Sequence, residues 1–376
     1  MTSQPADQTN TLLTAEHLLA GESYEVQRQA ILEAVREFIQ DHLDRIKQMT
    51  LDGASGTAVV EELTDAFDQL NDILFEVVSY DLDQDDVARC ALIALGGYGR
   101  REMNPKSDLD LMFFYESAGE TAAKIISDRM LYLLWDLGLD VGYSVRSSKD
   151  CIDNSQDSTV RTSLLDARLI SGNPDVFDSF QRTVGKYVLN HDSQRFVKLK
   201  LQENTERQKK YGSSVYLLEP NLKEGEGGLR DLHACLWIAR VKFKANTLQE
   251  LVIKGVLNEQ QADDFRAALD YLWRIRNYLH FMGQRKSDQI TFELQRQIAD
   301  AFGYIDTRKG SAVEQFMQDY YQHAAHVEHL ATSLISEATK RDKVEKAIFG
   351  FLVRRNLEDG FTVGRGELGF NDEQIF

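Results

Sequence analysis

Two regions of the chain have different patterns of hydrophobic and polar residues. In residues 58–79, apolar side chains recur every three or four positions with acidic residues between them, which predicts an amphipathic helix. Similar spacing predicts a helix over 23–48. From about residue 175 onward the pattern is helical almost throughout. The helices predicted there cover 175–210, 229–243, 247–256, 259–283, 292–302 and 311–340.

A strand-rich pattern lies between these helical regions. Residues 91–95 form a short apolar run that ends in two glycines, which is typical of a buried strand entering a turn. A second predicted strand covers 108–115, and a helix over 119–137 and a strand over 139–146 follow. The sequence therefore predicts an α+β protein, with a small mixed sheet followed by an all-helical domain.

The same patterns suggest domain boundaries. Residues 1–20 are expected to be a flexible polar leader, and 21–170 a mixed-sheet domain with its N-terminal helices. Residues 171–340 are expected to form the helical domain. The glycine-rich stretch 341–376 is expected to be a tail or the start of a further domain.

Charge and composition narrow the classes of partner. The net charge of −17 disfavours broad binding to nucleic acid or to an anionic membrane, since both need clustered basic residues. No apolar run approaches the ~20 residues that a membrane helix needs. The three cysteines are widely separated and show no metal-binding spacing, which fits a reducing compartment. We therefore expect a cytoplasmic protein without nucleic-acid or membrane partners.

The segment 96–110 carries the candidate chemistry. Asp108 and Asp110 are two positions apart on a predicted strand, so both carboxylates leave the same face with Cα atoms about 6.6–7 Å apart. Such a pair can converge on two metal ions about 3.5–4 Å apart. Because magnesium prefers oxygen ligands and pairs with phosphates, we expect two Mg²⁺ ions at these residues, with Mn²⁺ as a substitute.

Glycines and basic residues ahead of the acids complete this motif. Gly96 and Gly97 can adopt positive φ and let backbone N–H groups approach a phosphate. Arg100 can contact a phosphate oxygen with its planar guanidinium, and Ser107 is a further candidate nucleotide contact. The motif predicts attack of an acceptor hydroxyl on the α-phosphorus of a nucleoside triphosphate, with pyrophosphate leaving.

The chain resembles the bacterial PII-protein uridylyltransferases, members of the DNA-polymerase-β-like nucleotidyltransferase superfamily. A glycine pair, a spacer and a D-x-D strand mark that superfamily, and residues 96–110 follow this pattern. Residues 135–146 look like the family's next strand, and 162–172 like the helix after it. Residues 218–231 and 272–285 also match, so that the resemblance extends over most of the chain.

The resemblance implies a reaction and a partner. UMP would be transferred from UTP to a tyrosine hydroxyl on the trimeric PII nitrogen-signalling protein. Family members continue into an HD-type phosphohydrolase domain that removes UMP and into paired ACT domains that sense glutamine. No HD-type phosphohydrolase domain is recognised in this sequence, so we expect this chain to add the nucleotide and not to remove it.

A third carboxylate is usual in the superfamily, and its position here stays open. Asp140, Asp157 and Asp166 are the candidates. Asp157 is preferred as a third catalytic residue because it precedes the segment 159–168. The alternative for Asp157 is a helix-capping role.

Lys223 and Arg230 lie in a glycine-rich loop at a predicted helix start. The family match favours contact with the nucleotide or the acceptor, and the alternative is a tight turn before a capped helix.

Two other functions are compatible with the sequence. One is a different nucleotidyl transfer, such as adenylylation of a protein, since no base-specific contact is identifiable. The other is a non-catalytic module that binds PII or a nucleotide, which the intact D-x-D pair and glycine turn disfavour.

Overall fold

The computed structural model describes residues 14–189, 192–283, 285–308, 310–352, 355–356, 361–364 and 367–370. The chain divides into two compact units. Unit 1 comprises the described residues up to 189, together with Leu218–Leu222 and Leu269–Tyr320. Unit 2 comprises Asp192–Leu217, Lys223–Ala268 and the described residues from Tyr321 onward.

Unit 1 contains a four-stranded mixed sheet with the order β3-β2-β1-β4. The pair β2–β3 is parallel, whereas β1 pairs antiparallel with both β2 and β4. This confirms the predicted α+β class with a small mixed sheet. The strands are β1 (Cys90–Ala94), β2 (Leu109–Tyr115), β3 (Val141–Arg146) and β4 (Arg168–Gly172).

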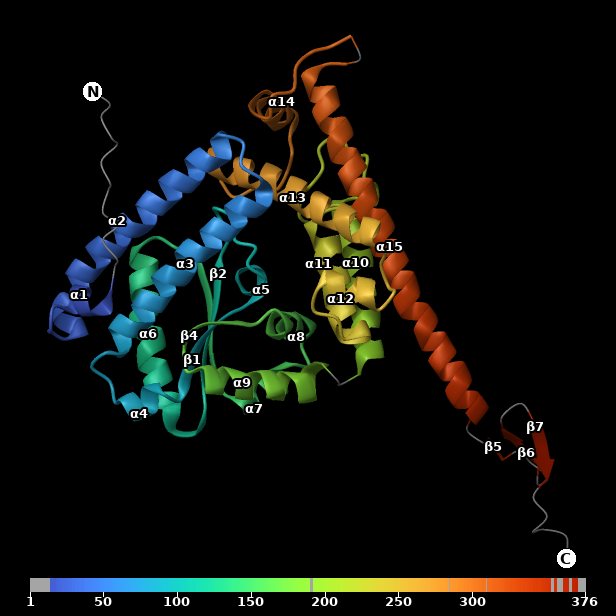
Figure 1. Ribbon diagram of the computed structural model, residues 1–376, viewed down its shortest axis with the longest axis horizontal. Coiled ribbons are helices and arrows are strands. Elements are labelled where there is room, and N and C mark those ends of the chain that lie inside the picture. Colours follow the sequence, from blue (N-terminus) through green and yellow to red (C-terminus); the bar gives the residue numbers. More distant parts are fainter. Residues whose placement is uncertain are drawn as a thin grey trace, which may run out of the picture. The chain divides into compact units, whose positions relative to one another are not determined.

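Helices cover both faces of this sheet (Figure 1). Alternate residues of β2 enter two separate cores, because successive side chains of a strand point to opposite faces. Leu111 and Phe113 pack with α1, α2, α3 and α6, whereas Met112 and Phe114 pack with α7, α8, α9 and the π-helical turn η2. The bounds are α1 (Ala15–Leu19), α2 (Tyr24–Leu51), α3 (Gly56–Ser79), α4 (Gln84–Val87), η1 (Ser117–Gly119), α6 (Glu120–Asp136), α7 (Ser148–Asn154), α8 (Ser158–Leu165), α9 (Pro174–Thr183) and η2 (Val184–Leu189).

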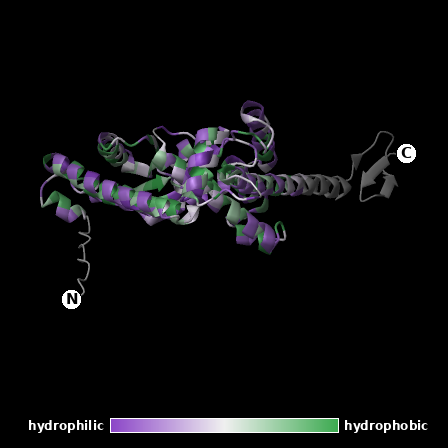
Figure 2. Cartoon of the chain, turned by 90° about the horizontal axis from the view of Figure 1, so that it is seen from above, coloured by the Kyte–Doolittle hydropathy of each residue, from purple (hydrophilic) through white to green (hydrophobic). Residues whose placement is uncertain are grey.

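Helix α3 illustrates how the sequence sets these elements. Its apolar stripe is buried, and the Ser55 hydroxyl accepts a hydrogen bond from the Ala58 amide at the N-terminus. Both hydrophilic and hydrophobic residues occur along the helices in Figure 2, as expected for amphipathic helices. In the described part of the chain, no helix has the length and apolar character needed to cross a membrane.

Unit 1 also takes in part of the predicted helical domain. Residues Leu269–Tyr320 belong to it, and they include the second half of α13 (Glu259–Met282) and all of α14 (Phe292–Ala301). The Asp270 carboxylate accepts hydrogen bonds from the backbone and hydroxyl of Thr57, at 2.8 and 2.6 Å. The division of the structure therefore differs from the boundary expected near residue 170, because helices far along the chain pack with the sheet domain.

Unit 2 is helical apart from its last described residues. Its helices are α10 (Ser193–Tyr211), α11 (Leu229–Ile238), the π-helical turn η3 (Ala239–Phe243), α12 (Leu248–Ile253), the first half of α13 and the part of α15 (Ala312–Leu352) after Tyr320. Three short antiparallel strands follow, β5 (Arg355–Asn356), β6 (Phe361–Gly364) and β7 (Glu367–Phe370).

Three predicted elements are wrong in detail. The helix expected over 162–172 ends at Leu165, and 168–172 form β4, because β1 offers a free edge for pairing. The single helix expected over 175–210 is divided into α9, η2 and α10. Of the expected leader, residues 1–13 lie outside the described chain, but Ala15–Leu19 form a helix capped by Thr14.

Candidate active site

Asp110 lies against two glycines at the start of β2. A Cβ atom on Gly96 would lie 2.8 Å from Asp110 Oδ2, and one on Gly142 would lie 2.6 Å from Oδ1. Gly142 is the register partner of Asp110 on β3. The glycine turn and Asp110, predicted as parts of one motif, therefore lie side by side. Any side chain at Gly96 or Gly142 would fill the space that the carboxylate occupies.

The glycine turn is the short helix α5 (Gly96–Gly99), which connects β1 to the residues before β2. Gly96 has a φ of +54°, a conformation that favours glycine. A Cβ on Gly99 would overlap the Asp166 carbonyl, so the turn passes very close to the end of α8. The amide of Leu95 donates to the Asp110 carbonyl at 2.9 Å, which fixes the turn beside the strand.

Arg100 follows this turn and is engaged in a buried ion-pair cluster. Its guanidinium donates to Glu102 at 2.9 Å and to Asp166 at 2.5 Å, and all three side chains are largely buried. Burial alone would lower the pKa of Arg100, but the charges of Glu102 and Asp166 raise it above its ordinary value. The cluster holds the turn to the end of α8, so a phosphate contact by Arg100 would require breaking it.

The three candidates for a third carboxylate have different surroundings. Asp157 is the N-cap of α8, accepting from the amides of Thr159 and Val160 at 2.8 and 3.0 Å, and Asp166 belongs to the Arg100 cluster. Asp140 precedes β3 as Asp108 precedes β2, and the Leu109 amide donates to its carbonyl at 2.9 Å. The capping alternative thus describes what Asp157 does in the structure, and the parallel register brings Asp140 beside Asp108.

Asp108 and Asp110 are a suitable donor set for a magnesium ion. Mg²⁺ is commonly held by one or two carboxylates, with waters and substrate phosphates as the other ligands. Asp108 is half-exposed, and Asp110 lies in the space left by Gly96 and Gly142. Within the described residues, no three His, Cys, Asp or Glu side chains gather as a metal-binding group.

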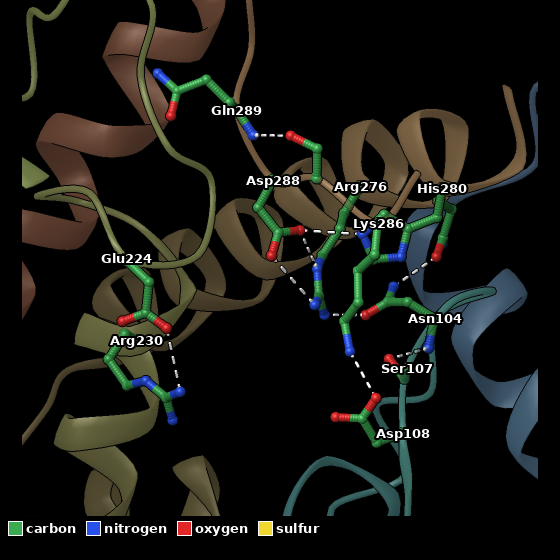
Figure 3. A network of polar contacts seen from close by, with 12 residues as sticks. Asn104, Ser107, Asp108, Glu224, Arg230, Arg276, His280, Lys286, Asp288 and Gln289 are labelled. Atoms are coloured by element: carbon green, nitrogen blue, oxygen red, sulfur yellow. Dashed lines mark hydrogen bonds and ion pairs between the residues drawn. The ribbon is translucent and has the colours of Figure 1, made fainter. Parts of the chain in front are cut away.

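The residues just before the acids form a hydrogen-bonded loop that is anchored by the buried side chain of Asn104 (Figure 3). The Asn104 amide group donates to Asn277 Oδ1 at 2.6 Å, and Arg276 donates to Asn104 Oδ1. The Ser107 hydroxyl accepts from the Asn104 backbone amide at 3.1 Å. Ser107, predicted as a nucleotide contact, therefore also closes the turn that leads to Asp108.

Asp288, in the stretch after α13, anchors this loop through Arg276. Its carboxylate accepts from Arg276 Nε at 2.8 Å and lies 3.1 Å from His280 Nε2. Burial alone would raise the pKa of Asp288, but the hydrogen bonds from His280 and Arg276 and the arginine charge bring it well below its usual range. Burial lowers the pKa of His280.

Sequence reasoning missed these supporting residues and one direct neighbour of the acids. Lys286 Nζ lies 2.7 Å from Asp108 Oδ1 (Figure 3). Lys106, in the loop before Asp108, donates to the Gly283 carbonyl. The similarity of residues 272–285 to the family indicates that this segment is important. It does not predict which of its residues contact the segment 96–110.

Lys223 and Arg230 belong to unit 2. The loop that bears them is tightly turned, since the Arg230 amide donates to the Lys223 carbonyl at 2.9 Å and Asp231 accepts from the Gly227 amide at 2.8 Å. The Arg230 guanidinium lies 3.2 Å from Glu224 and 5.9 Å from the Trp237 ring. It lines a cavity of about 360 Å³ within unit 2, together with Lys200, Arg207 and Trp237 among others.

Comparison with known proteins connects this site to a family. The family model described as GlnD PII-uridylyltransferase matches residues 195–335. Relatives named bifunctional uridylyltransferase/uridylyl-removing enzyme are 34% identical in Erythrobacter litoralis over 375 residues and 38% identical in Azospirillum brasilense over 290 residues. The chain belongs to the PII uridylyltransferase family. The resemblance predicted from the motifs is thereby confirmed.

These alignments cover most of this chain but less than half of each relative. The alignments cover 97% of this chain and 41% of the Erythrobacter relative, and 76% of this chain and 31% of the Azospirillum relative. The chain thus spans about two-fifths or less of the length of these relatives. A second family model, described as glutamate-ammonia ligase adenylyltransferase, matches residues 2–134, which include the glycine turn and both acids.

Proposed function

We propose that this chain catalyses nucleotidyl transfer from a nucleoside triphosphate to a hydroxyl group of an acceptor. The observation that carries the proposal is the placement of Asp108 and Asp110 at the start of β2, with the Asp110 carboxylate against Gly96 and Gly142. The uridylyltransferase names of the relatives support this reaction class.

Each residue of the site has a separate task in this proposal. Asp108 and Asp110 would hold two magnesium ions, which when bound neutralise the phosphates and lower the pKa of the attacking hydroxyl. Gly96 and Gly97 leave space for a phosphate to approach the turn. The ion pairs of Arg100 and the hydrogen bonds of Asn104 keep the glycine turn and the two acids in place. Fixed groups of this kind can accelerate the reaction by holding the substrate in the reactive orientation.

We propose UTP as the donor and a tyrosine of the PII signalling protein as the acceptor. The names of the relatives and of the matched family model support this choice. Lys223 and Arg230 are candidate contacts to the nucleotide or the acceptor, and the cavity that Arg230 lines supports a binding role. We also propose a cytoplasmic location, supported by three free thiols, and no nucleic-acid partner, supported by the acidic charge.

Adenylyl transfer is the second candidate, because an adenylyltransferase family model matches the part of the chain that contains the motif. A competition between UTP and ATP separates the two. The protein is incubated with Mg²⁺, purified PII and each labelled nucleotide, and the mass of PII is measured. Modification by UMP supports the proposal, and modification by AMP alone supports the alternative.

Substitution of the acids tests the site itself. We expect Asp108→Asn and Asp110→Asn each to lower transfer by about a thousandfold or more, because the ligands that neutralise the phosphates are lost. Asp153→Asn is a matched control, since Asp153 is an exposed carboxylate paired with Lys149. Transfer that both site variants retain at the parent rate would contradict the proposed function.

A further inference from the structure

Lys286 presents a positive charge to one of the two acids of the site. It lies in the stretch after α13, 178 positions from Asp108 in the sequence, and its Nζ is 2.7 Å from Asp108 Oδ1. The side chains are 39% and 52% exposed, respectively. The contact is visible at the lower centre of Figure 3, where the lysine reaches from its own segment down to the acid.

Residues on both sides of Lys286 make hydrogen bonds to other parts of unit 1. Two positions later, Asp288 is fixed by Arg276 and His280, and its carbonyl accepts from the Leu222 amide at 2.8 Å. On the other side, the Gly283 carbonyl accepts from Lys106. Lys286 is exposed, as are its neighbours Arg285 and Ser287, and its long side chain allows the ammonium to change partners.

The ammonium and a divalent cation compete for the same oxygen. Mg²⁺ would lie about 2.0–2.1 Å from a carboxylate oxygen, and the Lys286 ammonium, 2.7 Å from Asp108 Oδ1, opposes its binding because two cations so close together repel each other. An exposed lysine–carboxylate pair is weak, and its exchange for a doubly charged cation is therefore easy. The displaced ammonium then lies next to a site that receives a triphosphate, whose charge is opposite to its own.

We propose that Lys286 is a phosphate-binding residue of this site. Its ammonium passes from Asp108 to a phosphate oxygen of the nucleotide when a metal–nucleotide complex binds the acids. This inference rests on the proposed function, because it takes Asp108 as a metal ligand. It adds a residue that the motif at 96–110 does not contain.

Binding measurements on Lys286 variants test the inference independently of turnover. Mn²⁺ binding is measured by electron paramagnetic resonance, first without nucleotide, and UTP binding is then measured by calorimetry in Mn²⁺. For Lys286→Met we expect tighter Mn²⁺ binding without nucleotide, because the competing cation is gone. We expect UTP to bind about tenfold more weakly, because a charged hydrogen bond to phosphate is lost. Lys286→Arg should keep most of the UTP affinity.

Control variants separate a binding role from a structural one. Lys149→Met removes an exposed lysine that pairs with Asp153, and it should leave both affinities unchanged. A lower thermal stability of Lys286→Met with unchanged Mn²⁺ and UTP affinities would overturn the inference. If parent protein binds UTP in Mn²⁺ and Asp108→Asn does not, a negative result at Lys286 counts against this inference alone. If the parent binds no UTP, both proposals fail.

Discussion

At the scale of single residues, the site depends on buried polar side chains that satisfy each other. Asn104 is 1% exposed, and its amide group is paired with Asn277 and Arg276, whose guanidinium also binds Asp288. Removing one member of such a buried network leaves the others without partners, which costs more than the lost bond itself. These residues therefore hold in place the loop that leads to Asp108.

His280 makes the stability of this network depend on pH. Because burial lowers its pKa in the folded protein, the unfolded chain binds more protons between that lowered pKa and the ordinary value of about 6.5. The groups that face it are Arg276, Lys286 and Asp288, and the lowered pKa of Asp288 keeps that carboxylate ionised in this range. Stability contributed by neutral His280 is thus present above about pH 6.5 and lost as the pH falls.

We expect the free energy of unfolding of the parent protein to fall between about pH 7 and pH 5, and His280→Gln to remove part of that fall. Chemical denaturation at a series of pH values measures both. Parallel pH dependences of the two proteins would show that His280 does not contribute. An excess of stability in the parent that grows toward low pH would contradict the sign.

At the scale of elements, helix ends and strand starts place the functional groups. The parallel register of β2 and β3 sets Asp110 opposite Gly142, and the start of α8 uses Asp157 as its cap. A carboxylate that accepts from two amides at a helix N-terminus is a recurrent capping arrangement and stabilises the helix through its dipole as well. In the structure, Asp157 thus acts as a helix cap.

Asp157→Ala tests which purpose this acid serves. We expect a loss of about 1 kcal/mol in the free energy of unfolding, because α8 loses its cap, and transfer close to that of the parent. Ser55→Ala is the matched control, since Ser55 caps α3 in the same unit. A fall in transfer of about a hundredfold at unchanged stability would instead identify Asp157 as the third catalytic carboxylate.

At the scale of the whole molecule, unit 1 is assembled from three separate stretches of chain. The motif comes from the first, while Arg276, Asn277 and Asp288 come from the third. Unit 2 has its own buried residues, including Leu232, Cys235 and Ile238 of α11. Each unit contains at least one buried free thiol, so that the opening of each can be followed separately.

We expect all three cysteines to react slowly with a disulfide reagent in the native protein at about pH 8, and rapidly in denaturant. Burial raises the pKa of Cys90 to about 11 and that of Cys151 to about 12, and it also raises the pKa of Cys235. Peptide mass spectrometry identifies which thiol is labelled first as denaturant is added. Fast, complete labelling of native Cys90 or Cys151 would contradict their burial in the two cores of the sheet.

The sequence by itself determined the parts of this protein that depend on near neighbours. The turn at Gly96, the strand that follows Asp108 and carries Asp110, and α3 follow from side-chain periodicity and from the conformational freedom of glycine. These patterns act over a few residues, and so do the motifs that suggested the family. The preference for Asp157 shows the limit, because a capping acid and a catalytic acid look alike in a linear sequence.

Only the tertiary structure decided which distant residues surround the acids. Lys286 meets Asp108 and Arg276 meets Asn104 across more than 170 positions, and Arg100 is paired with Asp166 instead of being left exposed to a phosphate. Such contacts depend on how helices pack against the sheet, which no local periodicity encodes. For the same physical reason, the segment Leu269–Tyr320 belongs with the sheet although its sequence is as helical as the rest of the second half.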